Sequence, residues 1–124
     1  MALDIELIDQ GRGAHRVRLI GRLDTMAAPD LERRLEPLLG DPTVSVLVLE
    51  LGGLEYISSA GIRSVVRARK ALEGRGGRVA LVGLQPPVQK VFDIVKALPA
   101  GQIFASVAEL DAYLDAMQRR AGGG

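Results

Sequence analysis

VSVLVLEL, residues 44–51, is an almost unbroken run of valine and leucine. A strand of this composition is typical of the centre of an α/β sheet, where both faces of a strand are buried. Downstream, LEYISSAG at 54–61 marks the change from a strand pattern to a helical one. Two adjacent serines, Ser58 and Ser59, lie at that change. The segments on either side of 44–51 indicate the rest of the fold.

Two strands and a helix are predicted before residue 44. LDIELID (3–9) and HRVRLIG (15–21) alternate apolar and polar residues, and QGRG (10–13) between them predicts a hairpin turn. Leucines at 31, 35, 38 and 39 then recur at helical spacing. Pro29 suits the first turn of this helix, whereas Pro37 predicts a kink or an early end because proline lacks a backbone N–H.

Helices and strands alternate after residue 57. The helix that follows the serine pair is predicted to end at the glycine-rich segment 73–77, and its inward residues are Ile62, Val65, Val66 and Leu72. RVALVGL (78–84) predicts a buried strand. PPVQKVFDIV (86–95) predicts a helix that buries Val88, Val91, Phe92 and Val95.

A last strand and a last helix are predicted near the C-terminus. QIFAS (102–106) indicates a short strand, and Ser106 with Glu109 forms the capping box of a helix. The apolar side of that helix carries Val107, Leu110, Leu114 and Met117. We expect one domain over residues 1–118 and a disordered tail over 119–124.

The predicted element order is β-β-α-β-α-β-α-β-α. Alternating strands and helices imply an α/β fold with a mainly parallel sheet, and the opening hairpin makes the sheet mixed. We expect about four helices that cover at least one face of the sheet. Functional residues are then expected at the C-terminal ends of the strands.

Composition excludes several classes of function. Of 124 residues, 48% are hydrophobic and 25% charged, which is typical of a globular protein. The absence of cysteine excludes disulfides, thiolate metal sites and cysteine nucleophiles, and a net charge of +1 provides no field for nucleic acid. No apolar run reaches the roughly 18 residues of a membrane helix, and the N-terminus lacks the features of a signal peptide. The predicted location is the cytoplasm, without membrane insertion.

Residues for self-contained catalysis are also missing from the sequence. The one histidine, His15, lies on a predicted strand and is interpreted as structural. Around Ser59, Ile57 stands where the Gly-x-Ser-x-Gly elbow of serine hydrolases needs its first glycine. GRGA (11–14) and EGRGGR (73–78) complete neither phosphate-binding fingerprint and are interpreted as tight turns. We therefore predict that the protein is not an enzyme and has no catalytic residue, metal site or cofactor.

The serine pair fits a site that another protein modifies. A serine at the start of a helix can accept a hydrogen bond from one of the free backbone N–H groups, so capping explains one of the two. Ala60 and Gly61 are small, which predicts that the neighbouring hydroxyl is accessible. A phosphate there would add about −1.5 to −2 charges, which a helix N-terminus tolerates. A partner interface would have to desolvate or pair that charge.

LEYISSAGIRSVV (54–66) resembles the signature of STAS domains, specifically of the bacterial anti-sigma factor antagonists. GRLDT (21–25) resembles the family's Gly-x-Leu-Asp before the first helix, and GGRVALVGLQPPVQKVFDIV (76–95) resembles its later strand and helix. The similarity covers about residues 3–117 in the same element order. It implies a single STAS-like domain that regulates transcription by partner switching.

The resemblance also implies the modified residue. In that family a short Asp-Ser-x-Gly-Leu or Ser-Ser-x-Gly-Leu segment carries the phosphorylated serine. Aligning its glycine with Gly61 and its leucine with Ile62 places the phosphosite at Ser59. Ser58 then occupies a position that is often Asp, which leaves Ser58 as an alternative acceptor. The implied partners are an anti-sigma factor that is also a serine kinase, and a metal-dependent serine phosphatase. The unmodified domain would capture the kinase and so release a sigma factor.

Asp24 and Thr25 follow the second predicted strand, so we expect them to lie on the same rim as Ser59. The predicted partner-binding residues are Asp24, Thr25, Ser58, Ser59, Ala60, Gly61, Ile62, Arg63 and Arg67. Helix capping and partner contact both remain open for Asp24 and Thr25. Arg63, Arg67 and Lys70 form a basic stripe that is either solvated or docks on an acidic surface.

Two other classes of function remain. One is a non-switching STAS scaffold, or a subunit of a larger signalling or lipid-transport complex. The other, a small nucleotide-binding or hydrolytic domain, is disfavoured because a phosphate loop and a catalytic base are missing.

Overall fold

The computed structural model of the chain describes residues 3–97, and its elements follow the predicted order over that range. They are β1 (Leu3–Gly11), β2 (Ala14–Leu23), α1 (Ala28–Leu39), β3 (Val46–Ile57), α2 (Ser59–Glu73), β4 (Arg78–Val82) and α3 (Pro86–Ala97). The predicted strand at 102–106, the last helix with its capping box and the tail at 119–124 lie outside the described residues.

Within residues 3–97 the sheet has four strands in the order β1-β2-β3-β4. β1 is antiparallel to β2, whereas β2 with β3 and β3 with β4 are parallel. The predicted hairpin and the mixed, mainly parallel sheet are therefore confirmed. Gly11, Arg12 and Gly13 form the hairpin turn with φ values of 81°, 56° and 79°. Glycine suits two of these positions because it has no Cβ to clash in the left-handed region.

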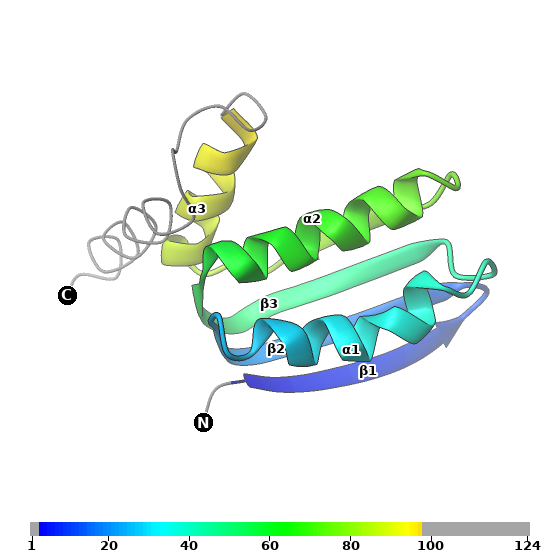
Figure 1. Ribbon diagram of the computed structural model, residues 1–124, viewed down its shortest axis with the longest axis horizontal. Helices are drawn as coiled ribbons and strands as arrows, with labels where there is room; N and C mark the ends of the chain where they lie inside the picture. The colour runs from blue at the N-terminus through cyan, green and yellow to red at the C-terminus, as the bar shows by residue number, and fades with distance from the viewer. Residues whose placement is uncertain (1–2, 98–124) are drawn as a thin grey trace.

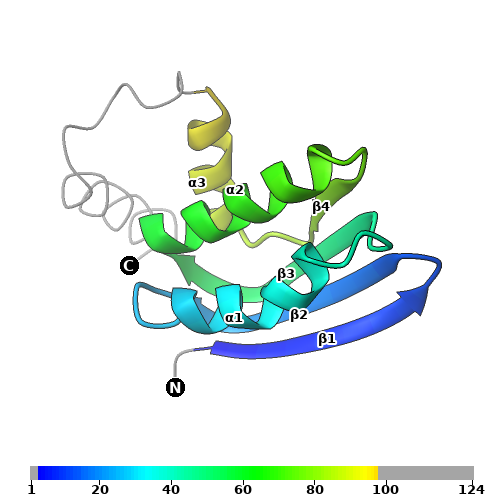
Figure 2. The ribbon, with the colours of Figure 1, turned by 45° about the vertical axis from the view of Figure 1, so that its right-hand side comes forward.

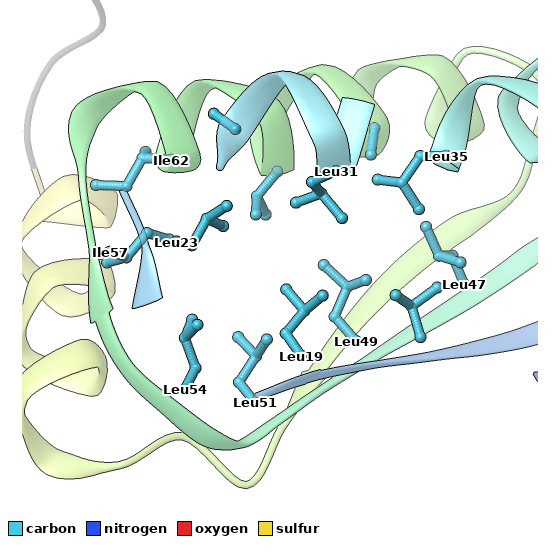
Figure 3. Close-up of a cluster of buried hydrophobic side chains, with 14 of the residues drawn as sticks. Leu19, Leu23, Leu31, Leu35, Leu47, Leu49, Leu51, Leu54, Ile57 and Ile62 are labelled. Atoms are coloured by element: carbon cyan, nitrogen blue, oxygen red, sulfur yellow. The ribbon is translucent and has the colours of Figure 1, made fainter. Parts of the chain in front are cut away.

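Helices α1 and α2 lie side by side over one face of the sheet, as the two ribbon views show (Figures 1 and 2). This confirms that helices cover at least one face. The aliphatic core fills the space between these helices and the strands (Figure 3). The side chains that β2 and β3 point into it have no exposed surface; they include Val17, Leu19, Leu23, Leu47, Leu49, Leu51, Leu54 and Ile57.

The opposite face of β3 is only half-buried at Val46, Val48 and Glu50, so the prediction that residues 44–51 are buried on both faces is wrong. Glu50 on that face forms ion pairs with Arg16 Nη1 at 3.1 Å and with Arg18 Nε at 3.4 Å. Arg18 Nη1 also pairs with Glu6 Oε1 at 2.9 Å. Charged groups remain partly hydrated in such a row because burying them without full pairing is costly. The adjacent Val48 is accordingly only half-buried.

Strand β3 ends at Ile57, six residues beyond the apolar run at 44–51. Two irregularities in its pairing with β2, one around Gly52 and one at Glu55, absorb the extra residues. A Cβ on Gly53 would lie only 2.9 Å from Ile20 Cγ1, so the strands approach too closely there for a side chain. Gly52 therefore lies at a bulge and Gly53 at a close approach of the two strands. Beyond them β3 continues to Ile57, so Ser58 lies at the carboxyl edge of the sheet.

Three smaller predictions also need correction. Helix α1 does not end early at Pro37: it runs on to Leu39, although the proline forgoes the backbone hydrogen bond that its N–H would have made one turn earlier. Val66 of α2 is 36% exposed, and Ala68 takes the buried position instead. Strand β4 is half-buried because it lies at the edge of the described sheet.

The predicted burial of α3 is confirmed for the side chains that the structure describes. Val88, Val91 and Phe92 are buried, as expected. The side chain of Val95 lies outside the described set.

Arg75, in the turn after α2, binds the end of α1. Its guanidinium donates hydrogen bonds to the carbonyls of Leu38, Leu39, Asp41 and Val44 at 2.6 to 3.3 Å. The last carbonyls of a helix lack intrahelical partners. A cation here supplies hydrogen-bond donors to them and interacts favourably with the negative end of the helix dipole.

We expect Arg75→Met to lower the free energy of unfolding by about 1–2 kcal/mol, because charge-assisted hydrogen bonds to these carbonyls are lost. Urea denaturation measures the change. Arg78→Met is the matched control, because Arg78 is exposed and its side chain makes no hydrogen bond or ion pair within residues 3–97. Equal losses in the two variants would show that the carbonyl contacts of Arg75 do not stabilise the fold.

Candidate functional site

Parallel pairing brings the ends of β2 and β3 to one rim of the molecule. Leu23 is paired with Ile57, the last residue of β3. The backbone N–H of Ser58 donates to the carbonyl of Leu23 over 2.9 Å. The segment after β2 therefore lies beside the junction of β3 and α2, and Asp24, Thr25 and the serine pair share this rim.

Ser58 is the N-cap of α2. Its backbone is extended, with φ −93° and ψ 172°, and its Oγ accepts a hydrogen bond from the Gly61 N–H at 3.1 Å. Its carbonyl accepts from the Ile62 N–H at 2.9 Å. The residue is only 3% exposed. The capping explanation for one of the serines therefore applies to Ser58.

Ser59 is the first residue of α2 and is also only 3% exposed. The prediction of an accessible hydroxyl beside the cap is wrong for this conformation. The small residues after Ser59 bring the helix close to the sheet: a Cβ on Gly61 would lie 2.7 Å from Leu23 Cγ and 2.9 Å from Ile57 Cγ1. Figure 3 shows Leu23, Ile57 and Ile62 grouped beneath the start of α2. Reaching the Ser59 hydroxyl requires movement of this first turn.

The segment between β2 and α1 combines a cap with an exposed apolar side chain. Asp24 Oδ1 accepts from the Ala27 N–H at 2.9 Å, and its carbonyl accepts from the Ala28 N–H at 3.0 Å. Asp24 therefore closes the turn into α1, whereas Thr25 is exposed. Met26 is 82% exposed. Sequence reasoning missed Met26, because a methionine before two alanines looks like the start of a buried helix face.

The basic stripe on α2 divides into paired and unpaired residues. Arg63, Arg67 and Lys70 are all exposed. Arg67 Nη1 forms an ion pair with Glu32 Oε1 on α1. Within residues 3–97, Arg63 and Lys70 form no ion pair. Arg63 is therefore the member of the stripe that lies near the serines and keeps its charge uncompensated.

A groove of about 360 Å³ lies between α1 and α2. Its lining residues are Glu32, Leu35, Glu36, Leu39, Gly40, Ser64 and Arg67. Arg67 thus connects the predicted partner-binding residues to this groove. The sequence could not reveal the groove, because it requires the relative position of two helices that are separated by a strand.

The described residues also bear on metal binding and membrane crossing. Residues 3–97 contain no group of three or more His, Cys, Asp and Glu side chains placed to hold a metal ion. Over the same residues, none of the helices has the length and apolar character that crossing a membrane requires.

The chain is similar in sequence to several proteins named as anti-sigma factor antagonists. The anti-sigma F factor antagonist of Paenibacillus polymyxa is 28% identical over 94 residues, which cover 76% of this chain and 80% of that protein. The putative anti-sigma factor antagonist BtrV of Bordetella bronchiseptica is 40% identical over 76 residues, 61% of this chain. The match spans 65% of that protein, and also 65% of the anti-sigma F factor antagonist of Lysinibacillus sphaericus, which is 30% identical.

Solved structures show the same fold. The anti-sigma factor antagonist SpoIIAA in its unphosphorylated form superposes with a TM-score of 0.69 at 25% identity, over 75% of this chain and 81% of that chain. An anti-sigma factor antagonist from Mycobacterium paratuberculosis superposes with a TM-score of 0.69 at 20% identity, over 94% and 95%. The family model of the STAS domain matches residues 8–110. The chain therefore belongs to the STAS domain family.

Proposed function

We propose that this protein is an anti-sigma factor antagonist that binds an anti-sigma factor serine kinase while Ser59 is unmodified, and that phosphorylation of Ser59 releases it. The relatives named as anti-sigma factor antagonists support the antagonist role. The observation that carries the proposal is the unequal position of the two serines. Ser58 holds the helix through Gly61, whereas Ser59 begins the helix on the rim that also carries Thr25 and Met26.

In the unmodified state the rim is suited to a protein partner. Met26 supplies an exposed apolar side chain, and Thr25 and Arg63 supply polar groups around it. The buried Ser59 hydroxyl adds no charge that a partner would have to desolvate. An interface centred on an apolar anchor with a polar surround is typical of protein recognition.

Phosphorylation changes this rim because a dianion cannot remain at a position that is 3% exposed. The modified side chain must turn outward, toward the surface that the partner occupies. A partner then has to desolvate or pair about two negative charges. Because the added phosphate is removed only by hydrolysis, return to the binding state requires a second enzyme. We assign that step to a metal-dependent serine phosphatase.

The test is incubation with the cognate anti-sigma factor kinase and ATP, followed by mass mapping of the phosphate. We expect the phosphate on Ser59 and no phosphate in Ser59→Ala. Ser58→Ala should still be phosphorylated, although it should lower the free energy of unfolding by about 1 kcal/mol because the cap to Gly61 is lost. Ser58→Asp is the matched variant, since aspartate also caps helices well.

The outcomes separate the alternatives. Loss of phosphorylation in a folded Ser58→Ala variant would move the modification to Ser58. If neither serine gains phosphate while the complex with the kinase still forms, the protein is a non-switching scaffold.

A further inference from the structure

We infer that Arg63 is the internal counter-charge of the switch: once Ser59 carries a phosphate, the Arg63 guanidinium pairs with it inside the same helix. This inference rests on the proposed function, since it concerns the phosphorylated form of Ser59. It assigns to Arg63 a role in regulation that is separate from its contact with a partner.

The first support is the spacing of the two residues on α2. Ser59 is the first residue of the helix and Arg63 follows four positions later. Residues at this separation lie on the same side of a helix, with their Cβ atoms about 5–6 Å apart. An arginine side chain spans that distance to a phosphate on the preceding turn. The order also suits the pair, because the negative group lies toward the helix N-terminus.

The second support is the availability of Arg63. It is exposed and forms no ion pair within residues 3–97. The neighbouring arginines are engaged: Arg67 pairs with Glu32, and Arg69 pairs with Glu73 at 3.0 Å. Arg22, at the end of β2, stacks over the Tyr56 ring at 4.2 Å. A phosphate at Ser59 would therefore find its uncommitted cation at Arg63.

The third support is the burial of Ser59. A phosphate attached there has to leave its present surroundings, because a site that is 3% exposed cannot hydrate a dianion. Outward rotation of the modified side chain at the first turn of α2 exposes the phosphate on the side of the helix where Arg63 also lies. Pairing with arginine then stabilises the outward position, since guanidinium matches phosphate geometry with two parallel hydrogen bonds.

This pairing gives one arginine two exclusive uses. In the unmodified protein the Arg63 charge is free to meet an acidic group on the kinase. In the phosphorylated protein the Arg63 guanidinium is paired with the phosphate. The partner therefore faces an additional negative charge and loses the positive charge of Arg63. Phosphorylation thus weakens the interface at two points although it modifies only one residue.

The test is a ³¹P NMR titration of protein that carries phosphoserine at position 59, installed during synthesis so that the kinase is not required. The second pKa of free phosphoserine is about 6. In the otherwise wild-type chain we expect this pKa to be lower than in the Arg63→Gln background by about 0.15 to 0.4 units, which corresponds to about 0.2 to 0.5 kcal/mol for an ion pair at this spacing. Arg63→Lys should retain most of the shift, because it keeps the positive charge.

Lys70→Gln is the matched control. Lys70 is also exposed and unpaired among the described residues, but it lies about three turns away from Ser59 along α2. It should leave the phosphoserine pKa unchanged. The inference is overturned if Arg63→Gln titrates like the wild type, or if Lys70→Gln raises the pKa as much as Arg63→Gln does. Failure of the kinase to modify Ser59 would count against the proposed function alone, because the titration does not depend on the kinase.

Discussion

Ser59→Asp should lower the affinity for the anti-sigma factor kinase by more than about a hundredfold, whereas Ser59→Ala should bind like the wild type. Aspartate introduces a fixed negative charge at a position that is 3% exposed, so the charge must turn outward into the partner surface. An unpaired charge in an interface costs several kcal/mol, and about 2.7 kcal/mol corresponds to a hundredfold change. Calorimetric titration with the kinase measures both affinities.

The matched control makes the same substitution at the other end of the sheet. Ser45→Asp changes an exposed serine just before β3, far from the rim, and should not alter the affinity. Thermal unfolding of both aspartate variants separates loss of the interface from loss of the fold. Equal affinities for Ser59→Asp and Ser59→Ala in folded protein would contradict the electrostatic switch.

Gly61→Ala should destabilise the protein by about 2 kcal/mol, although alanine in place of glycine ordinarily stabilises a helix by about 1 kcal/mol. The new Cβ would lie 2.7 Å from Leu23 Cγ and 2.9 Å from Ile57 Cγ1. Leu23 Cγ is the branch point of its side chain and Ile57 Cγ1 is bonded directly to a branched Cβ, so neither atom is the free end of a flexible side chain. Relief therefore requires the start of α2 to move away from the sheet.

Urea denaturation tests this prediction, with Gly52→Ala as the control. A Cβ on Gly52 would meet its nearest neighbour, the Gly83 carbonyl oxygen, at 3.5 Å, which is an ordinary contact. That variant should change stability by less than about 1 kcal/mol. Stabilisation by Gly61→Ala would show that the junction tolerates a gap between α2 and the sheet. Because Ser58 and Ser59 lie just before Gly61 in the same turn, their displacement by Gly61→Ala should also weaken kinase binding.

The fold was largely predictable from the sequence because its signals are local. Alternation at 3–9 and 15–21 indicated the hairpin, and the valine and leucine run at 44–51 indicated a central strand. The errors lie where tertiary contacts overrule a local signal. The run at 44–51 indicated a strand buried on both faces, yet Glu50 on one of those faces pairs with Arg16 and Arg18 of β2.

The candidate site was predictable as a location more than as a geometry. Strand order alone indicated that Asp24 and Ser59 meet at one rim, because both follow parallel neighbours. Exposure was not predictable, as Ser59 and Met26 show. The small residues after Ser59 indicated open space, but that space is taken up by close packing on Leu23.

The sequence by itself determined the element order over residues 3–97, the aliphatic core and the place of a serine pair at a helix start. These properties depend on residue type and on spacing along the chain, which any reader of the sequence can follow. Only the tertiary structure decided which serine caps the helix, how deeply Ser59 is buried and that, among residues 3–97, Arg67 of the basic stripe forms an ion pair whereas Arg63 does not. Burial and pairing depend on groups that lie far apart in the chain, and packing of α1 and α2 on the sheet brings them together.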